Sequence, residues 1–127
     1  MGYVQSYRDL DVYKLAKTLS ANIFELTKRF PKEETYSLTD QVRRSSRSVG
    51  AQIAEAWGKR RYEKHFISKL TDADGEQQET QHWIETARDC SYLADEDAVT
   101  LIEKYTQLGK MIGSMINKYT SFCGKRN

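Results

Sequence analysis

The sequence predicts an all-α fold, an antiparallel up-down-up-down four-helix bundle. Apolar residues recur in steps of three and four along four segments, which is the spacing of amphipathic helices. The chain has a single proline, Pro31, and few Asn-Gly or Asp-Gly pairs, so the usual signals of β-hairpins are scarce. The loops between the segments are short, as this kind of bundle requires. With 127 residues, the chain fits a single domain over residues 1–127.

The first two helices are expected at about residues 9–30 and 37–57. The Phe30-Pro31 step should end the first helix, because the residue before a proline disfavours the α conformation. Ser37 and Asp40 resemble a capping box at the start of the second helix, and Gly58 offers a stop. The apolar stripes expected to face the core are Val12, Ala16, Leu19, Ile23, Leu26 and Phe30, and then Leu38, Val42, Val49, Ile53 and Ala56.

The third and fourth helices are expected at about residues 62–93 and 96–121. Gly75 lies inside the third helix and costs roughly 1 kcal/mol relative to alanine. Asp95 is the candidate N-cap of the fourth helix, where carboxylates also suit the positive end of the helix dipole. The expected stripes are Phe66, Leu70, Ala73, Gln77, Thr80, Ile84, Ala87 and Ser91, and then Val99, Ile102, Tyr105, Leu108, Ile112, Met115 and Tyr119.

The composition is that of a globular chain in water, with 39% hydrophobic and 30% charged residues. No apolar run approaches the roughly 20 residues of a membrane-spanning helix, and the N-terminal residues do not resemble a signal peptide. We therefore expect a cytoplasmic protein with no membrane partner. Cys90 and Cys123 lie far apart in the sequence; buried thiols or a disulfide would both fit, and the expected compartment favours free thiols.

The net charge of +2 conceals a division of charge along the chain. Residues 41–69 hold 8 basic and 2 acidic side chains, whereas residues 70–103 hold 1 and 10. The basic group falls on the second helix and the turn that follows it, and the acidic group falls mainly on the third helix. This segregation favours either ion pairing between helices or binding to a charged partner.

Small residues occur where a solvated helix normally carries long charged ones. Gly50, Ala51 and Ala54 lie off the core stripe of the second helix, and Gly109 and Gly113 are four residues apart on the fourth. Small side chains let another helix approach closely, although a neutral surface would carry them too. We expect these five residues to form the subunit interface of a homo-oligomer.

Seven basic residues form the candidate nucleic-acid-binding set, namely Arg43, Arg44, Arg47, Lys59, Arg60, Arg61 and Lys64. Such clusters neutralise phosphates without contacting bases. For the three arginines of the second helix, the competing interpretation is ion pairing, either with acidic residues of the third helix in the same chain or between subunits. The Lys59-Arg60-Arg61 run has only Glu63 close by in the sequence, so contact with a polyanion is favoured there.

The sequence contains no recognised catalytic or phosphate-binding motif and no zinc-ligand spacing, so we expect no enzyme activity and no cofactor. Glu79 and His82 form one E-x-x-H pair, but a di-iron bundle needs two such pairs, and no metal site is expected. Glu55 and Glu79 are candidates for structural polar residues that tie the second helix to the third.

The runs DQVRRSSRSV at residues 40–49 and SVGAQIAEAWGKRR at residues 48–61 resemble the four-helix-bundle family encoded in intervening sequences of bacterial 23S rRNA genes. The similarity extends from YRDLDVYKLA at residues 7–16 through SYL at residues 91–93. Where the family commonly reads Asn-Ile-Ala-Glu-Gly, this chain has Gln52 and Ala56 at the outer positions, which suggests a sub-branch. Further matching residues are Phe30, Pro31, Glu34, Tyr36, Glu79, Thr80 and Gln81.

The resemblance implies an antiparallel four-helix bundle, commonly assembled as a ring-like homopentamer, with no established enzymatic activity. The family is also similar to the accessory protein of diversity-generating retroelements, a basic pentamer that associates with nucleic acid and a reverse transcriptase. The leading hypothesis is a non-enzymatic oligomer that binds nucleic acid, with structured RNA favoured, through the seven basic residues. A nucleic-acid enzyme is a further candidate partner. The alternative is a scaffold that binds another protein and uses its segregated charges for subunit assembly.

Overall fold

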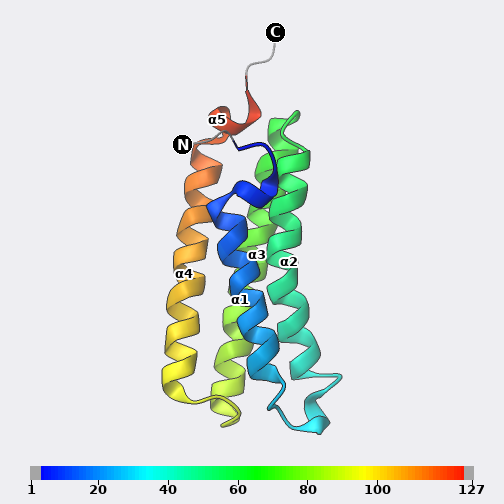
Figure 1. Ribbon diagram of the computed structural model, residues 1–127, viewed down its shortest axis with the longest axis vertical. Helices are drawn as coiled ribbons and strands as arrows, with labels where there is room; N and C mark the ends of the chain where they lie inside the picture. Colours follow the sequence, from blue (N-terminus) through cyan, green and yellow to red (C-terminus); the bar gives the residue numbers. More distant parts are fainter. Residues whose placement is uncertain (1–3, 125–127) are drawn as a thin grey trace.

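The computed structural model describes residues 4–124 and confirms the all-α fold, with no strand within these residues. The four long helices are α1 (Asp11–Thr27), α2 (Leu38–Gly58), α3 (Glu63–Asp89) and α4 (Asp95–Asn117). Each runs antiparallel to the next, and α4 lies beside α1 and closes the bundle (Figure 1). The short elements are the 3₁₀ turns η1 (Tyr7–Asp9) and η2 (Lys32–Glu34) and the helix α5 (Tyr119–Cys123). None of the helices in this described range has the length and apolarity needed to cross a membrane.

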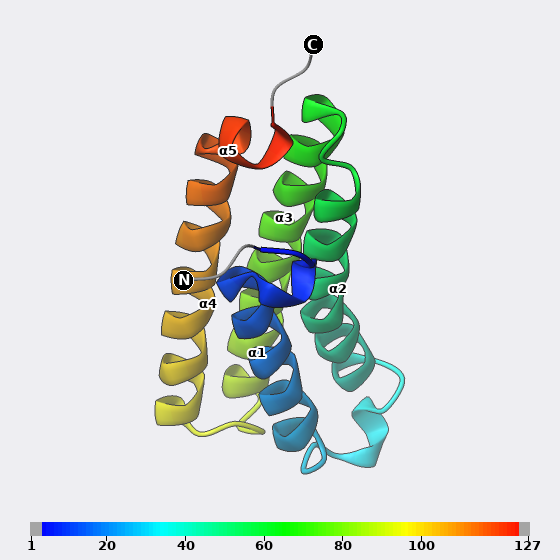
Figure 2. The same cartoon turned by 45° about the horizontal axis from the view of Figure 1, so that its top comes forward.

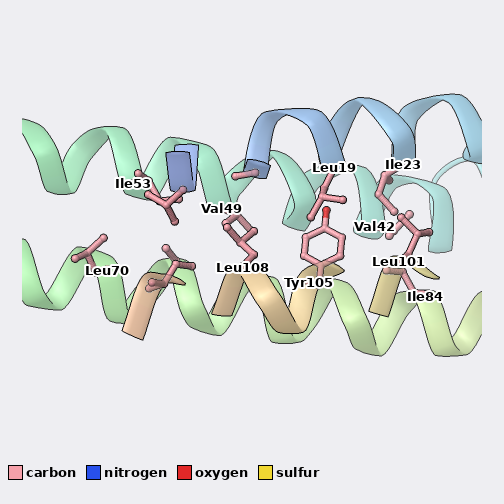
Figure 3. Packing of buried hydrophobic residues seen from close by; sticks show 14 of the residues in the cluster. Leu19, Ile23, Val42, Val49, Ile53, Leu70, Ile84, Leu101, Tyr105 and Leu108 are labelled. Atoms are coloured by element: carbon pink, nitrogen blue, oxygen red, sulfur yellow. The ribbon is translucent and has the colours of Figure 1, made fainter. Parts of the chain in front are cut away.

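The core lies between the four long helices and is built largely from the predicted stripes (Figure 3). In α3 every member of the predicted stripe is buried, whereas Ser91, which follows the end of this helix, is exposed. In α4 the prediction is wrong at the first position, because Val99 is 51% exposed and Ala98 is buried in its place. Val99 precedes the buried Leu101 by two residues, or about 200° around the helix, and so faces away from the core.

A hydrogen bond inside the core fixes α2 against α3. The hydroxyl oxygens of Ser45 and Thr80 are 2.8 Å apart, and both side chains are fully buried. A buried hydroxyl that loses its partner costs free energy. This pair therefore disfavours any sliding of α2 along α3, and it helps to set the height of the α2 side chains.

The helices begin close to the predicted residues, but two predicted caps are wrong. Ser37 makes no capping bond with its side chain; Glu34 Oε1 instead accepts the Leu38 amide at 3.2 Å. Asp95 is the first residue of α4 rather than its cap, and Ala94 holds the N-cap position without a side-chain bond. The first turn of α4 is nevertheless acidic, as the helix dipole favours.

The helix ends depart further from the prediction, for local reasons. After Thr27 the chain continues in tighter i→i+3 hydrogen bonds as far as Phe30, so α1 ends three residues early. At the end of α3, the Tyr92 amide bonds to the Ala87 carbonyl and the Ser91 amide to the Arg88 carbonyl, both at 2.9 Å. These bonds form a Schellman motif, which stops the helix at residue 89.

The expected fourth helix is divided into α4 and α5. Lys118, with φ −102° and ψ 26°, separates the two elements. The chain then turns over the end of the bundle (Figure 2). There Phe122 stacks on Phe66 of α3, with ring centroids 5.8 Å apart. The change of direction at Lys118 places α5 over the end of the core next to Phe66.

Candidate nucleic-acid interface

The seven predicted basic residues fall into two groups at different heights on the bundle. Arg43, Arg44 and Arg47 lie in the first half of α2, towards the end of the bundle where α1 finishes (Figure 1). The second group lies at the opposite end, and we call it the turn patch: Lys59, Arg60, Arg61 and Lys64. The twelve residues from Arg47 to Lys59 correspond to about 18 Å along the helix axis. The two groups are therefore separate contact areas.

The three arginines of α2 line one surface hollow with a volume of about 380 Å³. Its other lining residues are Thr35 in the loop before α2, and Thr39 and Asp40 in the first turn of α2. We call this group of six residues the arginine hollow.

Arg43 and Arg47 are held against α1. Their guanidinium carbons lie 4.6 Å and 5.6 Å from the centre of the same Phe24 ring, within the range of cation–π attraction. Arg43 Nε also donates to Thr27 Oγ1 at 2.7 Å. Neither arginine forms an ion pair with a described residue. Their positive charges are therefore not offset by a direct carboxylate partner there.

Arg44 faces the other way, towards α3. Its Nη2 lies 2.9 Å from Glu79 Oε2 and 3.0 Å from Gln41 Oε1. The same Glu79 oxygen accepts Trp83 Nε1 at 3.0 Å. Within the described part of the chain, ion pairing therefore applies to Arg44 alone among the three arginines. Because the side chains of Arg44 and Glu79 are 53% and 35% exposed, water screens the pair, which is worth no more than about 1 kcal/mol.

The turn patch combines one anchored arginine with exposed cations. Arg60 Nε donates to the Trp57 carbonyl at 2.8 Å, and its guanidinium carbon lies 3.5 Å from the centre of the Trp57 ring. Lys59, Arg61 and Lys64 are exposed, and their side-chain nitrogens make no hydrogen bond or ion pair with residues 4–124. They can therefore reach a polyanion without breaking an existing contact.

Acidic and amide side chains gather on the opposite side of the molecule, between α3 and α4. They line a depression of about 510 Å³, which we call the acidic depression: Asp74, Gln77, Gln78, Gln81, His82, Glu85, Thr106, Gly109 and Lys110. The arginine hollow lies against α1 and α2 instead. The two carboxylates of the acidic depression, Asp74 and Glu85, are accompanied by Lys110, whereas Glu79 of the same helix α3 lies on the side of α2 and pairs with Arg44. The segregation of charge along the sequence is therefore only partly kept in the fold.

The carboxylates predicted to be structural lie across the α2–α3 contact. Glu55 of α2 pairs with Lys69 of α3 at 3.4 Å, and Glu79 of α3 pairs with Arg44. Both carboxylates remain partly exposed.

The residues considered for a metal site or a disulfide form neither in the described part of the chain. His82 contacts the neighbouring Trp83 ring, and no group of three metal-ligating side chains occurs there. Cys90 is exposed and Cys123 is half-buried, and both are thiols rather than halves of a disulfide.

The small residues predicted for a subunit interface lie in two places. Gly50, Ala51 and Ala54 line a groove of about 440 Å³ between α1 and α2, with Tyr13 opposite Gly50. A methyl group added at Gly109 would lie only 2.7 Å from Gln77 Nε2, so this glycine permits close packing of α3 and α4 within one chain. A methyl group at Gly113 would meet no atom within 4 Å.

Sequence reasoning missed four residues that shape the arginine hollow, three of which lie outside α2. Glu34 holds the loop before α2 in place, because its two carboxylate oxygens bind the Leu38 amide and the Tyr92 hydroxyl, the latter at 2.9 Å. The hydrogen bond to Glu34, together with partial desolvation, raises the pKa of Tyr92 to about 12. Phe24, Thr27 and Thr39 showed only helical spacing in the sequence, and nothing there indicated which helix would face them.

A model of the 23S rRNA-intervening sequence protein family matches residues 8–114 of the chain. Among solved structures, the chain is similar to a protein of unknown function from the S23 ribosomal protein family of Bacteroides thetaiotaomicron, with 28% sequence identity and a TM-score of 0.75. That alignment covers 84% of this chain and 95% of the other. A comparison with curated proteins gave no significant match.

Proposed function

The chain belongs to the 23S rRNA-intervening sequence protein family, and we propose that it is a non-enzymatic protein that binds nucleic acid, with structured RNA as the favoured ligand. The family's association with an rRNA intervening sequence supports RNA over DNA. The binding surface comprises the arginine hollow and the turn patch. Both are basic and both lie away from the acidic depression.

The main support for this proposal is the state of Arg43 and Arg47. Two guanidiniums rest on one aromatic ring and have no carboxylate partner among the described residues. Guanidiniums match the geometry of phosphate oxygens and remain charged at any physiological pH. Since no base-reading motif accompanies them, contact is made mainly with the phosphate backbone and is sensitive to salt.

A double substitution in the turn patch tests the proposal. Lys59→Gln with Arg61→Gln removes two exposed cations that make no polar contact with residues 4–124, so folding should be unaffected. We expect weaker binding of a structured RNA in gel-shift titrations. The slope of log K against log salt should fall in magnitude by about 0.7–0.9 for each phosphate that the variant no longer neutralises.

The matched control is Lys104→Gln with Lys118→Gln, which makes the same change in net charge on exposed residues of α4 and its C-cap. Equal weakening in both double variants would show that only net charge matters and would contradict a defined surface. If the wild-type protein gives no salt-dependent shift at low ionic strength, nucleic-acid binding itself is wrong.

The alternative, a protein-binding scaffold assembled through its charges, is favoured by the acidic depression. A basic side and an acidic side on one molecule suit head-to-tail contacts between copies, which close into rings. We propose a homo-oligomer, with five subunits favoured, in which Gly50, Ala51, Ala54, Gly109 and Gly113 lie at or near subunit contacts. The partners are other copies of the chain, RNA or DNA, and a nucleic-acid enzyme, with the cytoplasm as the compartment.

Light scattering coupled to size exclusion tests the assembly. A pentamer would have five times the chain mass of 14.7 kDa, and excess absorbance at 260 nm would report nucleic acid that co-purifies. A monomer at all micromolar concentrations would exclude the oligomer. If Lys59→Gln with Arg61→Gln dissociates the assembly and leaves RNA binding unchanged, the scaffold is the better description.

A further inference from the structure

We propose that the arginine hollow is a discrete binding site for a single phosphate group, a refinement that rests on the proposed function. With a volume of about 380 Å³, the hollow is large enough to admit a phosphate with its water, and its lining rather than its size selects the ligand. The site would hold one phosphate of an RNA chain in a fixed position, while the turn patch makes looser contacts about 18 Å away.

The guanidinium groups of the hollow are positioned before any ligand arrives. Phe24 supports both Arg43 and Arg47, and the bond from Arg43 Nε to Thr27 leaves the two Nη groups of Arg43 without a partner among the described residues. Side chains that are already ordered lose less entropy on binding. Two positive charges held beside one ring repel each other, and a bound phosphate would offset that repulsion.

A buried threonine provides a second, independent indication. Thr39 is only 7% exposed, it lines the hollow, and its hydroxyl makes no hydrogen bond with any described residue. The Thr39 hydroxyl oxygen is not one of the fully buried atoms without a partner, so it reaches the surface of the hollow, where it can donate to a phosphate oxygen in place of water. Thr35 differs, because its hydroxyl donates to the Lys32 carbonyl at 2.7 Å and therefore contributes shape rather than a free donor.

The remaining charges at the hollow partly oppose one another. Asp40 repels an anion, and Arg44 already shares its charge with Glu79. Two guanidiniums without ion pairs outweigh the single carboxylate of Asp40. The hollow also adjoins the first turn of α2, but the Glu34 carboxylate already accepts the Leu38 amide there, so the helix end adds little attraction for a further anion. The balance predicts a phosphate site of modest affinity.

Inorganic phosphate alone tests the site, independently of RNA. The full-length protein, labelled with ¹⁵N, is titrated at constant ionic strength while the Thr39 amide and the arginine Nε–H signals are followed, with chloride as the reference anion. We expect saturable shifts confined to the hollow. The affinity should be about tenfold lower in Arg47→Gln and measurably lower in Thr39→Val, since each variant removes a hydrogen bond to a charged group. Thr100→Val on α4 and Lys104→Gln are the matched controls and should leave the affinity unchanged.

Two outcomes would overturn the inference: shifts that chloride reproduces, and a phosphate affinity that Arg47→Gln does not change. Arg47→Gln is the decisive variant because Arg47 is exposed and its loss leaves no buried cavity. Should Thr39→Val fold poorly, Arg47→Gln still decides the question.

Short RNAs of one sequence, with a 5′-phosphate or a 5′-hydroxyl, identify the source of the phosphate. A terminal phosphate is indicated if the phosphorylated RNA binds more tightly and Arg47→Gln abolishes the difference. An internal phosphodiester is indicated if both RNAs bind equally and both weaken in Arg47→Gln. Phosphate bound in the hollow without RNA retention would support the site and refute the proposed function. If the protein binds RNA and Arg47→Gln changes neither RNA binding nor phosphate binding, the proposed function is supported and the phosphate site is refuted.

Discussion

Replacing Tyr105 with phenylalanine should stabilise the protein. The Tyr105 side chain is fully buried, its ring lies in the core beside Leu108, and its hydroxyl points towards α1 near Leu19 (Figure 3). No described residue accepts or donates a hydrogen bond to that hydroxyl. Burying a hydroxyl without a partner costs about 1–3 kcal/mol. Phenylalanine keeps the ring and leaves only a small void of about 10–15 Å³, which costs about 0.3 kcal/mol.

The net gain for Tyr105→Phe is therefore about 1 kcal/mol in the free energy of unfolding, or about 4 °C in melting temperature for a chain of this size. Urea denaturation followed by circular dichroism at a fixed protein concentration measures it, and the slope m should not change. A variant that is less stable than wild type by more than about 0.5 kcal/mol would refute the reasoning, because the hydroxyl would then have a partner such as an internal water.

Alkaline pH gives the same variant a second test. Burial raises the pKa of Tyr105 above its ordinary value of 10. Above pH 10 the unfolded chain therefore releases this proton while the folded chain retains it, so stability falls as the pH rises. The Tyr105→Phe variant lacks this contribution and should lose less stability between pH 9 and about 11 than wild type does. An identical decline in both proteins would show that Tyr105 ionises as it does in water.

Three further substitutions test local contacts by the same denaturation assay. Tyr92→Phe removes the hydrogen bond to Glu34 and should lower stability at neutral pH. Since the pKa of Tyr92 is raised to about 12, the difference in stability between wild type and variant should shrink from pH 10 towards pH 12. A difference that does not change with pH would contradict the hydrogen bond. Ser91→Gly should add about 0.5–1 kcal/mol, because φ at this position is 65° and glycine adopts it without strain, whereas Ser91→Ala should add nothing. Gly75→Ala should add about 1 kcal/mol, since a methyl group there meets no atom within 4 Å and alanine favours the helix; a loss would reveal a neighbour at this exposed position.

The fold could be predicted from spacing because burial in a bundle depends mainly on position around the helix. The α3 stripe shows this well, since Gln77 and Thr80 are buried even though they are polar. Their position on the inward face of the helix, rather than the polarity of their side chains, determined that they are buried. The helix ends were harder to predict, because caps depend on contacts across the chain. Glu34, rather than Ser37, binds the first amide of α2, and no local pattern of residues indicates that choice.

The candidate site was predictable in its residue types but not in its grouping. Arg43 and Arg47 are one turn apart, so they share a face of α2, whereas Arg44 is rotated by about 100° from Arg43. Spacing therefore separates Arg44 from the other two. Spacing does not determine whether α1 or α3 packs against a given flank of α2, because bundles of either handedness bury the same stripes. In this bundle α1 lies on the side of Arg43 and Arg47.

The handedness of the bundle thus decides which arginines remain available to an anion. In the opposite-handed arrangement of the same four helices, the flank of α2 that carries Arg43 and Arg47 would face α3. Phe24 lies on the flank of α1 that faces α2 here, and it would then face α4. Phe24 and Thr27 would then not hold the two guanidiniums, and the arginine hollow would lose the side that α1 provides. The arginine hollow is therefore a property of the topology as much as of the sequence. Its clearest signature would be Arg44→Gln, which should weaken phosphate binding much less than Arg47→Gln in the same titration, because Arg44 already has Glu79 as its partner.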